Sequence, residues 1–427
     1  MTAVGAREPA PARTARSGAP RRESATRAAV RTAWESPVAS YYLIASVTLV
    51  LLALGLVFVL SSSTVYSLKA TGGVSPLKQF LDQAKFALIA LPLAVLMSRL
   101  PVRVIRAFAW PAYVAAIGLT AATFSPLGYN VGGNRGWIDI GFTLIQPAEF
   151  VKLALALWLG LVLSQRQRDL GQLKRLALPL LGGFFLLGIQ LYVTADLGTV
   201  LIMGALMFGA LWVAGVPMRV FVMLAVGAAS VAAMFATTGE TRMARIKAML
   251  GIGELSDQLA WQIGHSLQAL GTGGISGVGL GGSRSKWLYL PAAQNDFIFA
   301  IIGEELGLMG TLLVLALFAA LAVGLARVIL RHPDPFVKIT TGGIAAWLLA
   351  QAVVNIGVVT AVFPVIGVPL PLVSAGGSSL IATLIALGIV LAFARTEPGA
   401  PEALRARRGA VRRSFGVLAA GLTGGRR

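Results

Sequence analysis

The chain has 427 residues, of which 56% are hydrophobic and only 12% are charged, and its formal net charge is +19. A soluble globular domain carries about 25% charged residues, so this composition excludes a soluble enzyme and indicates a polytopic membrane protein. The chain contains no cysteine, which excludes disulfides and thiolate metal sites.

Apolar runs long enough to cross a bilayer recur along the chain, since each crossing by a helix takes about 20 mostly apolar residues. About ten runs follow one another, near 41–62, 81–98, 106–125, 147–164, 176–194, 197–215, 217–237, 296–326, 338–362 and 374–394. None has the alternating pattern of a membrane strand, so helices are expected throughout. The predicted fold class is an all-α polytopic membrane protein with a large extracytoplasmic loop between helices seven and eight.

The main clusters of basic residues fall on one side of this arrangement. They lie in the N-terminal tail and within 99–106, 166–175, 327–338 and 405–427. The positive-inside rule then places both tails in the cytoplasm. Residues 1–38 are predicted to be a disordered basic tail, 39–395 the membrane domain and 396–427 a second basic tail. The tails are expected to contact anionic lipids and not nucleic acid, because aromatic residues are not interleaved with the basic ones.

Two outer loops are long, residues 126–146 and residues 238–295. Loops of this length in a compact domain are usually functional when they are not disordered. In the longer loop, residues 242–250 have apolar and basic residues at helical spacing, which predicts an amphipathic helix at the membrane interface. A second helical stripe over 260–270 precedes a glycine-rich run, 271–282, that would allow backbone amides to approach a ligand closely.

Asp296 stands at the junction between the long loop and the eighth apolar run. One interpretation is helix capping, because Asn295 or Asp296 would cap a helix that starts at Phe297, and the helix dipole would favour the charge. The other interpretation is a general base or metal ligand facing a substrate in the outer leaflet, since acids within a membrane domain are usually functional. The sequence leaves both open.

Outer basic residues go against the positive-inside trend, and they allow two interpretations. Their long side chains could reach lipid headgroups, or they could bind an anionic, phosphate-bearing lipid. The residues concerned are Arg135, Arg242, Arg245, Arg284 and Lys286.

Other charged residues near the apolar runs are expected to serve structure. Glu149 and Lys152 are three positions apart and would pair on one helix face, and Asp196 would pair or cap the next helix. Glu304 and Glu305 are adjacent on a predicted helix, so they cannot both point into one cavity, and at least one should make a helix–helix contact.

The segment 364–379, PVIGVPLPLVSAGGSS, interrupts the last helix pair with prolines and glycines. In a bilayer, irregular backbone is tolerated only where it is buried in protein or lines a cavity. The predicted topology places this segment on the same outer side as Asp296. Together they predict one cavity that opens outward.

Several segments together resemble the FtsW/RodA/SpoVE-like (SEDS) family of peptidoglycan polymerases, over about residues 41–395. They are GNRGWIDIG and QPAEFVK within 133–152, ADLGT at 195–199, WQIGHSLQALGTGG and GVGLGGSRSKWLYLP within 261–291, NDFIFAIIGEELG at 295–307 and the segment 364–379. The resemblance implies ten membrane helices in the cytoplasmic membrane of a bacterium. It also implies polymerisation of lipid II into glycan strands at the outer face, and a branch of the family that serves cell division, of actinobacterial type.

The resemblance further implies an essential acid, which falls on Asp296, and partners that include a class B penicillin-binding transpeptidase and other division proteins. The hypothesis is an inverting glycosyltransferase in which Asp296 is the general base. Candidate contacts to the substrate or to its undecaprenyl pyrophosphate are Arg135, Arg242, Arg245, Lys286, Trp137, Gln262 and Ser374.

Two alternative functions remain, a lipid II flippase and a non-catalytic division scaffold. Broken helices and intramembrane acids suit a transporter, but the long loop and the key acid both lie on one face. No metal-ligand cluster stands out, because His265 and His332 are the only histidines and lie far apart. A divalent cation, Mg²⁺ or Mn²⁺, is left open as a cofactor.

Overall fold

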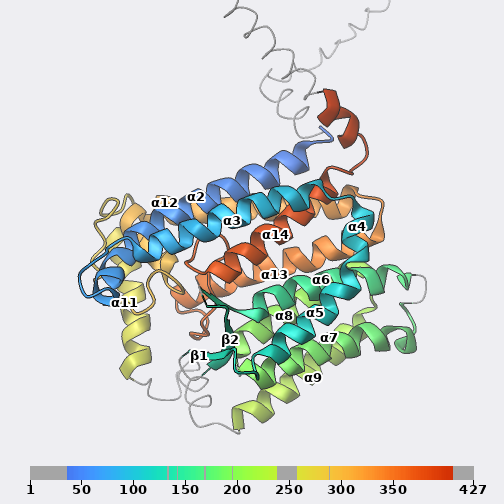
Figure 1. The fold of residues 1–427 in the computed structure, drawn as a ribbon, viewed down its shortest axis with the longest axis horizontal. Coiled ribbons are helices and arrows are strands. Elements are labelled where there is room, and N and C mark those ends of the chain that lie inside the picture. Colours follow the sequence, from blue (N-terminus) through green and yellow to red (C-terminus); the bar gives the residue numbers. More distant parts are fainter. Residues whose placement is uncertain are drawn as a thin grey trace, which may run out of the picture.

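The computed structural model describes residues 36–131, 134–141, 143–167, 170–194, 196–237, 257–287 and 289–406. This part of the chain consists mainly of long helices (Figure 1). They are α2 (Ala39–Ala70), α3 (Lys78–Arg99), α4 (Val102–Ala107), α5 (Ala109–Ala122), α6 (Pro147–Ser164), α7 (Leu173–Thr194), α8 (Leu197–Ala214), α9 (Met218–Thr237), α11 (Asp257–Gly273), α12 (Ile298–Arg331), α13 (Pro335–Val359) and α14 (Gly377–Ala394).

The helices match the ten predicted crossings. Within the described residues, eight are long and apolar enough to cross a membrane, and two shorter apolar helices, Ala109–Ala122 and Met218–Gly227, occupy the third and seventh predicted positions. The prediction of a polytopic helical membrane protein is therefore confirmed. The helix predicted over 242–250 lies outside the described residues, whereas the stripe over 260–270 is part of α11.

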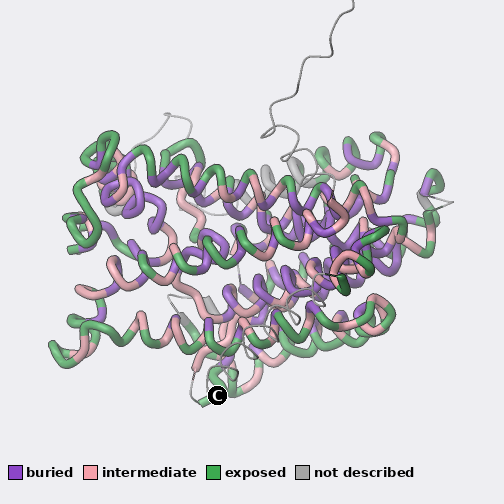
Figure 2. Tube along the Cα trace, turned by 90° about the horizontal axis from the view of Figure 1, so that it is seen from above, coloured by how far each residue is buried: buried purple, intermediate pink, exposed green. Residues whose placement is uncertain are grey.

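The helices lie side by side along the long axis of the molecule (Figure 1). α13 packs against α6 and α8, α14 packs against α3, and α12 packs against α2. α6 is buried almost throughout, so it forms the centre of the bundle. Buried and exposed positions alternate along the peripheral helices (Figure 2), and their exposed side chains include many large apolar ones. This pattern is typical of helices that face lipid on one side and protein on the other.

The beginning of α2 and the segment after α14 meet at one end of the bundle. Ser40 Oγ donates to Glu397 Oε2 at 3.2 Å, and Arg331 Nε, at the end of α12, pairs with the same oxygen at 3.4 Å. Glu397 is buried, so described contacts continue beyond residue 395, the predicted end of the membrane domain. These contacts place both ends of the described chain on the same side of the bundle.

A small antiparallel sheet interrupts the helical architecture between α5 and α6. It contains β1 (Gly128–Val131), β2 (Asn134–Asp139) and β3 (Leu144–Ile145), in that order, and Tyr129 pairs with Trp137. The sequence analysis gave residues 126–146 as a long loop and did not predict these strands. The strands are short, and strands of this length lack enough residues to establish a period of two.

α12 is broken at Gly307, whose φ of 67° and ψ of −159° are not helical. The glycine-rich segment after α11 enters this break and satisfies the freed backbone groups, as a bilayer requires. Four backbone hydrogen bonds make the junction: Val278 N to Glu304 O (3.0 Å), Gly279 N to Glu305 O (3.0 Å), Leu308 N to Gly274 O (2.9 Å) and Met309 N to Ile275 O (3.3 Å). The first part of α12 is thereby fixed to the glycine-rich segment.

Replacing Gly307 by alanine should destabilise the protein. A Cβ at this position would lie 2.6 Å from the carbonyl carbon of Ile275, and this backbone conformation, which is almost restricted to glycine, costs a residue with a side chain about 1–3 kcal/mol. We expect Gly307→Ala to unfold at a clearly lower temperature in detergent. Gly264→Ala is the matched control, because no atom lies within 4 Å of the added Cβ there and alanine favours a helix. Equal melting temperatures for wild type and Gly307→Ala would contradict this account.

Candidate functional site

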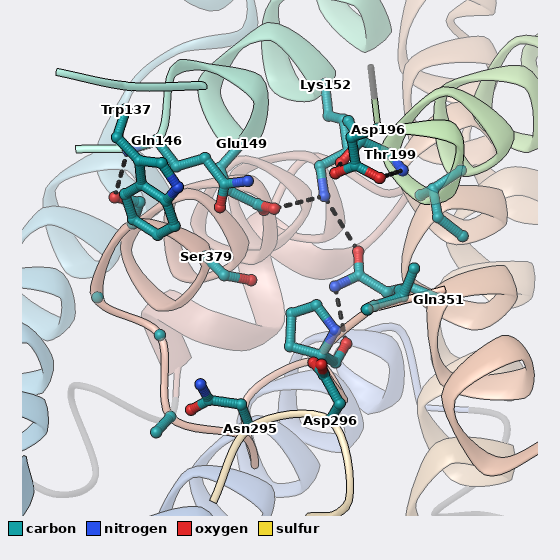
Figure 3. A pocket seen from close by; sticks show the side chains of 18 residues that line it. Trp137, Gln146, Glu149, Lys152, Asp196, Thr199, Asn295, Asp296, Gln351 and Ser379 are labelled. Carbon is teal, nitrogen blue, oxygen red and sulfur yellow. Dashed lines mark hydrogen bonds and ion pairs between the residues drawn. The ribbon is translucent and has the colours of Figure 1, made fainter. Parts of the chain in front are cut away.

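A cavity of about 160 Å³ lies where the ends of several helices meet the irregular segments of the chain. Its walls come from β2, from the beginnings of α6 and α8, from the middle of α13, and from the segments before α12 and α14. Figure 3 shows the polar side chains that line it, namely Trp137, Gln146, Glu149, Lys152, Asp196, Thr199, Asn295, Asp296, Gln351 and Ser379. The predicted cavity beside Asp296 and the segment 364–379 is therefore present.

Asp296 lines this cavity and does not cap α12. The helix begins at Ile298, its N-cap residue is Phe297, and the N-cap position makes no side-chain hydrogen bond. The capping interpretation of Asn295 or Asp296 is therefore wrong. Within the described residues, the Asp296 carboxylate has no hydrogen bond or ion pair, and a Cβ built on Gly367 would lie 3.8 Å from its Oδ2. The carboxylate is thus left available to a ligand.

Burial raises the pKa of Asp296 to about 6, and the negative charge of Asp196 contributes in the same direction. Removing a carboxylate from water disfavours its ionised form, and a second carboxylate nearby has the same effect. A carboxylate whose pKa lies close to neutral accepts a proton more effectively than an ordinary aspartate does. The site therefore has the properties of a general base.

Asp196 caps α8 and faces the same cavity. Its Oδ1 accepts a hydrogen bond from the Thr199 backbone N at 3.1 Å, and its Oδ2 accepts one from Thr199 Oγ1 at 2.7 Å. The prediction of a capping role for Asp196 is confirmed. Because both oxygens are used by Thr199, Asp196 acts on Asp296 through its charge.

Glu149 and Lys152 form the predicted pair on one face of α6. Lys152 Nζ lies 2.9 Å from Glu149 Oε1, and both side chains are almost fully buried. Lys152 Nζ also donates to Gln351 Oε1 at 3.2 Å and lies 4.9 Å from the centre of the Trp347 ring. Gln351 in turn donates to the Pro369 carbonyl at 2.9 Å. This network joins α6, α13 and the irregular segment on one wall of the cavity.

Ser374 lies behind the cavity wall, where it holds the backbone next to Asp296. Its Oγ donates to the Asn295 carbonyl at 2.6 Å and accepts from the Leu370 N at 2.8 Å. Gln83 of α3 supports the same segment, because its Nε2 donates to the Ser374 carbonyl at 3.4 Å and its Oε1 accepts from Gly376 N at 3.0 Å. Ser374, predicted to contact substrate, therefore reaches the site through the backbone.

Lys286, predicted to bind pyrophosphate, does not line the cavity. It is buried, and its Nζ lies 3.4 Å from Glu305 Oε1 and 3.4 Å from Ser61 Oγ. Ser61 of α2 also donates to Glu305 Oε1 at 2.6 Å. Lys286 thus joins α2, α12 and the glycine-rich segment. These contacts hold its side chain outside the cavity that Asp296 lines.

Glu304 also binds the segment that precedes α12. Its carboxylate accepts from Ser283 Oγ at 2.6 Å and from the Arg284 backbone N at 2.9 Å. Neither Glu304 nor Glu305 lines the cavity, and Glu305 contacts α2, as the prediction of at least one helix–helix contact required.

Of the other residues predicted to contact substrate, one lines the cavity, one lies elsewhere, and three have side chains outside the described positions. Trp137 lines the cavity with Asp296, whereas Gln262 lies on α11 and does not. Arg135 belongs to β2, but its side chain, like Arg242 and Arg245 as a whole, falls outside the described positions. In the part of the chain that the structure describes, no group of three or more His, Cys, Asp or Glu could hold a metal ion.

Some cavity residues were not predicted as site residues, notably Gln146, Thr199 and Gln351. Gln351 had a usable signal, since it is an amide in the middle of the apolar run WLLAQAVV, and polar residues inside spans are functional candidates. Thr199 and Gln146 belong to short motifs whose relation to the cavity depends on contacts between distant segments.

Comparisons with known proteins agree on one family. A family model described as cell cycle protein, FtsW/RodA/SpoVE, matches residues 41–398. A probable peptidoglycan glycosyltransferase FtsW of Mycobacterium tuberculosis is 37% identical over 87% of this chain and 71% of its own length. The corresponding Coxiella burnetii protein is 35% identical over 81% of this chain and 94% of its own.

Solved structures show the same fold. One, described as the structural coordination of polymerization and crosslinking by a peptidoglycan synthase complex, matches with a TM-score of 0.66 and 30% identity over 82% of this chain and 96% of that chain. The rod shape determining protein RodA of Thermus thermophilus matches with a TM-score of 0.61 and 29% identity over 83% of this chain and 96% of that chain.

Proposed function

Since the chain belongs to the FtsW/RodA/SpoVE family of cell cycle proteins, we propose that it is a peptidoglycan glycosyltransferase that polymerises lipid II during cell division. The observation that carries the mechanism is the Asp296 carboxylate, which lines the cavity without a hydrogen-bond partner among the described residues and has a pKa of about 6. The mycobacterial and other relatives named FtsW support the division role.

In the proposed reaction, the 4-hydroxyl of the N-acetylglucosamine of lipid II attacks the anomeric carbon of the growing chain. Asp296 takes the hydroxyl proton as the new C–O bond forms, and the bond to undecaprenyl pyrophosphate breaks with the electron pair leaving on the phosphate. A positioned base of this kind contributes about 10²–10⁴-fold to the rate. Arg135, Arg242 and Arg245 remain candidates for contacts to the leaving group.

We place the cavity at the outer face of the cytoplasmic membrane and both ends of the chain inside. Ser40 and Arg331 meet at Glu397, while Asp296 precedes the opposite end of the 34-residue α12. Of the basic clusters, 99–106 and 327–338 lie at the Glu397 side, since Arg395 donates to the Ser98 carbonyl and Arg106 pairs with Asp334. The positive-inside rule assigns that side to the cytoplasm. A lipid-linked sugar in the outer leaflet could then enter the cavity.

The partner we propose is a class B penicillin-binding transpeptidase, which crosslinks the strands that this chain makes. The support is the structural likeness to a protein in a peptidoglycan synthase complex that couples polymerization to crosslinking. Other division proteins and anionic lipids would complete the assembly.

The test is polymerisation of labelled lipid II by the purified chain with its cognate transpeptidase, with products separated by size. Glycan strands are expected from the wild-type protein. If a competent partner is present and no strands form, while the protein speeds transfer of lipid II between the leaflets of proteoliposomes, the flippase alternative replaces this proposal. If neither activity is found, the scaffold alternative replaces it.

The rate of polymerisation should depend on the protonation of Asp296. The base works only when ionised, and its pKa is raised to about 6, so the rate should fall about tenfold for each pH unit below 6 and level off above it. The measurement is kcat/KM for lipid II between about pH 3 and about pH 8 in one detergent. An acid limb centred near the ordinary aspartate value of 3.8 would contradict the assignment.

A further inference from the structure

Asn355 is a buried amide on α13, one turn beyond Gln351 and behind the cavity wall. Its Nδ2 donates one hydrogen bond to the backbone carbonyl of Asp296 and another to the backbone carbonyl of Val368, both at 2.8 Å. A side-chain amide has two N–H groups, so both of its donors are used on these two carbonyls.

One carbonyl belongs to Asp296 itself, and the other belongs to Val368, in the turn beside the Asp296 carboxylate. Gly367, next to Val368, is the residue whose added Cβ would lie 3.8 Å from Asp296 Oδ2. Two carbonyl oxygens that approach one another repel, and the Asn355 amide placed between them removes that repulsion. Asn355 therefore fixes the distance between the backbone of Asp296 and the turn opposite its carboxylate.

Besides Asn355, Ser374 restrains the backbone at this point, since its Oγ donates to the preceding Asn295 carbonyl at 2.6 Å, but no described contact restrains the Asp296 side chain directly. The described contacts give its carboxylate no hydrogen bond, and its backbone N donates only to the Ala292 carbonyl, at 3.1 Å. The direction of the carboxylate thus depends on where the backbone of residue 296 is held. Among the described contacts, Asn355 supplies the side-chain hydrogen bond to the carbonyl of residue 296.

We propose that Asn355 is a positioning residue for the polymerisation reaction, which holds the Asp296 backbone against the turn at Gly367 and Val368 so that the carboxylate points into the cavity. This inference rests on the proposed function, since it assigns Asn355 a role in the step that Asp296 performs. Asn355 itself does not line the cavity, so it acts through Asp296 and not on the substrate.

The charged groups that face Asp296 across the cavity define what a change at Asn355 would do. They are Asp196 at the start of α8 and the pair Glu149 and Lys152 on α6. In Asn355→Asp the side chain keeps its shape, but a carboxyl group that is 1% exposed and faces two carbonyl oxygens is neutral near pH 7, so it donates at most one hydrogen bond. The backbone at Asp296 is then held less firmly, the carboxylate moves relative to these charged groups, and its pKa should change.

The experiment compares wild type with Asn355→Asp and Asn355→Ser, the second of which keeps one hydroxyl donor and serves if the first does not fold. Misplacement of a catalytic group by about 1 Å can cost about 10²-fold, so kcat should fall about 10- to 100-fold with KM for lipid II changed less than about 2-fold. The acid limb of the rate should also move in Asn355→Asp, because the displaced carboxylate has different charged neighbours, and loss of packing elsewhere would not produce this change.

Ser266→Ala is the matched control. Ser266 is buried, and its Oγ donates to the Val359 carbonyl of α13 at 2.8 Å, so the variant loses a comparable bond to the same helix without touching Asp296. Its kcat should stay near that of wild type. A fall in kcat as large as that of the Asn355 variants would show that any loss of packing on α13 has this effect, and would overturn the inference.

A second readout separates this inference from the proposed function. The Asp296 carboxyl can be titrated by infrared difference spectroscopy of wild type against Asp296→Asn, with no substrate present. If wild type makes strands and the Asn355 variants keep their kcat, the inference falls and the function stands. If wild type makes no strands, the function falls, and an unchanged titration of Asp296 in Asn355→Asp would remove the inference as well.

Discussion

Asp296→Asn should abolish strand synthesis while leaving the protein folded. Asparagine has nearly the same shape but cannot accept a proton at neutral pH, so the proposed base is lost and kcat should fall by about 10²–10⁴-fold. Because the described structure gives the Asp296 carboxylate no hydrogen bond and no capping role, the substitution breaks no described contact. The measurement is polymerisation of labelled lipid II with the transpeptidase present.

Thermal unfolding provides the check on folding. The pKa of Asp296 is raised in the folded protein, so at neutral pH the ionised carboxylate is less stable folded than unfolded, and a neutral amide removes this cost. Asp296→Asn should therefore unfold at the same temperature as wild type or at a higher one. Asp82→Asn, which removes an exposed carboxylate, is the activity control and should polymerise normally. A folded Asp296→Asn protein with full activity would mean that the base lies elsewhere.

Much of the fold follows from local sequence. The crossings were predictable because length and apolar character decide whether a helix spans a bilayer, and the helices fall where the apolar runs do. Glu149 and Lys152 pair because residues three apart share a helix face, and Asp196 caps α8 because a carboxylate reaches the N–H groups just ahead of it. Each of these interactions is made within a few residues of the chain.

Contacts between distant segments could not be predicted from the sequence. Lys286 looked like a phosphate ligand, but the break at Gly307 lets the glycine-rich segment enter α12, and this brings Lys286 beside Glu305. Ser374 looked like a substrate contact, but its hydrogen bond to the Asn295 carbonyl places it behind the wall. Asn355, like Gln351, is an amide inside an apolar run, but its role depends on where two separate loops return to α13.

Lys152→Met should cause a large loss of stability, because it leaves the Glu149 carboxylate buried without its cation. Breaking a buried ion pair by removing one partner costs about 3–5 kcal/mol. Lys152 and Glu149 have 3% and 4% of their side chains exposed, and their atoms lie 2.9 Å apart. The measurement is the free energy of unfolding in detergent, because Lys152 also lines the cavity and activity would report both effects together.

The chain contains its own control for the ion pair, Lys85 with Asp82. This pair has the same spacing in sequence and a similar distance, 3.0 Å, but its side chains are 72% and 48% exposed. Exposed pairs contribute about 0–1 kcal/mol, so Lys85→Met should hardly change stability. Replacing both buried partners, Glu149→Gln with Lys152→Met, should recover much of the loss, since no uncompensated charge remains. If Lys85→Met and Lys152→Met destabilise equally, burial does not decide the strength of these pairs, and the α6 pair does not hold the cavity wall as its contacts suggest.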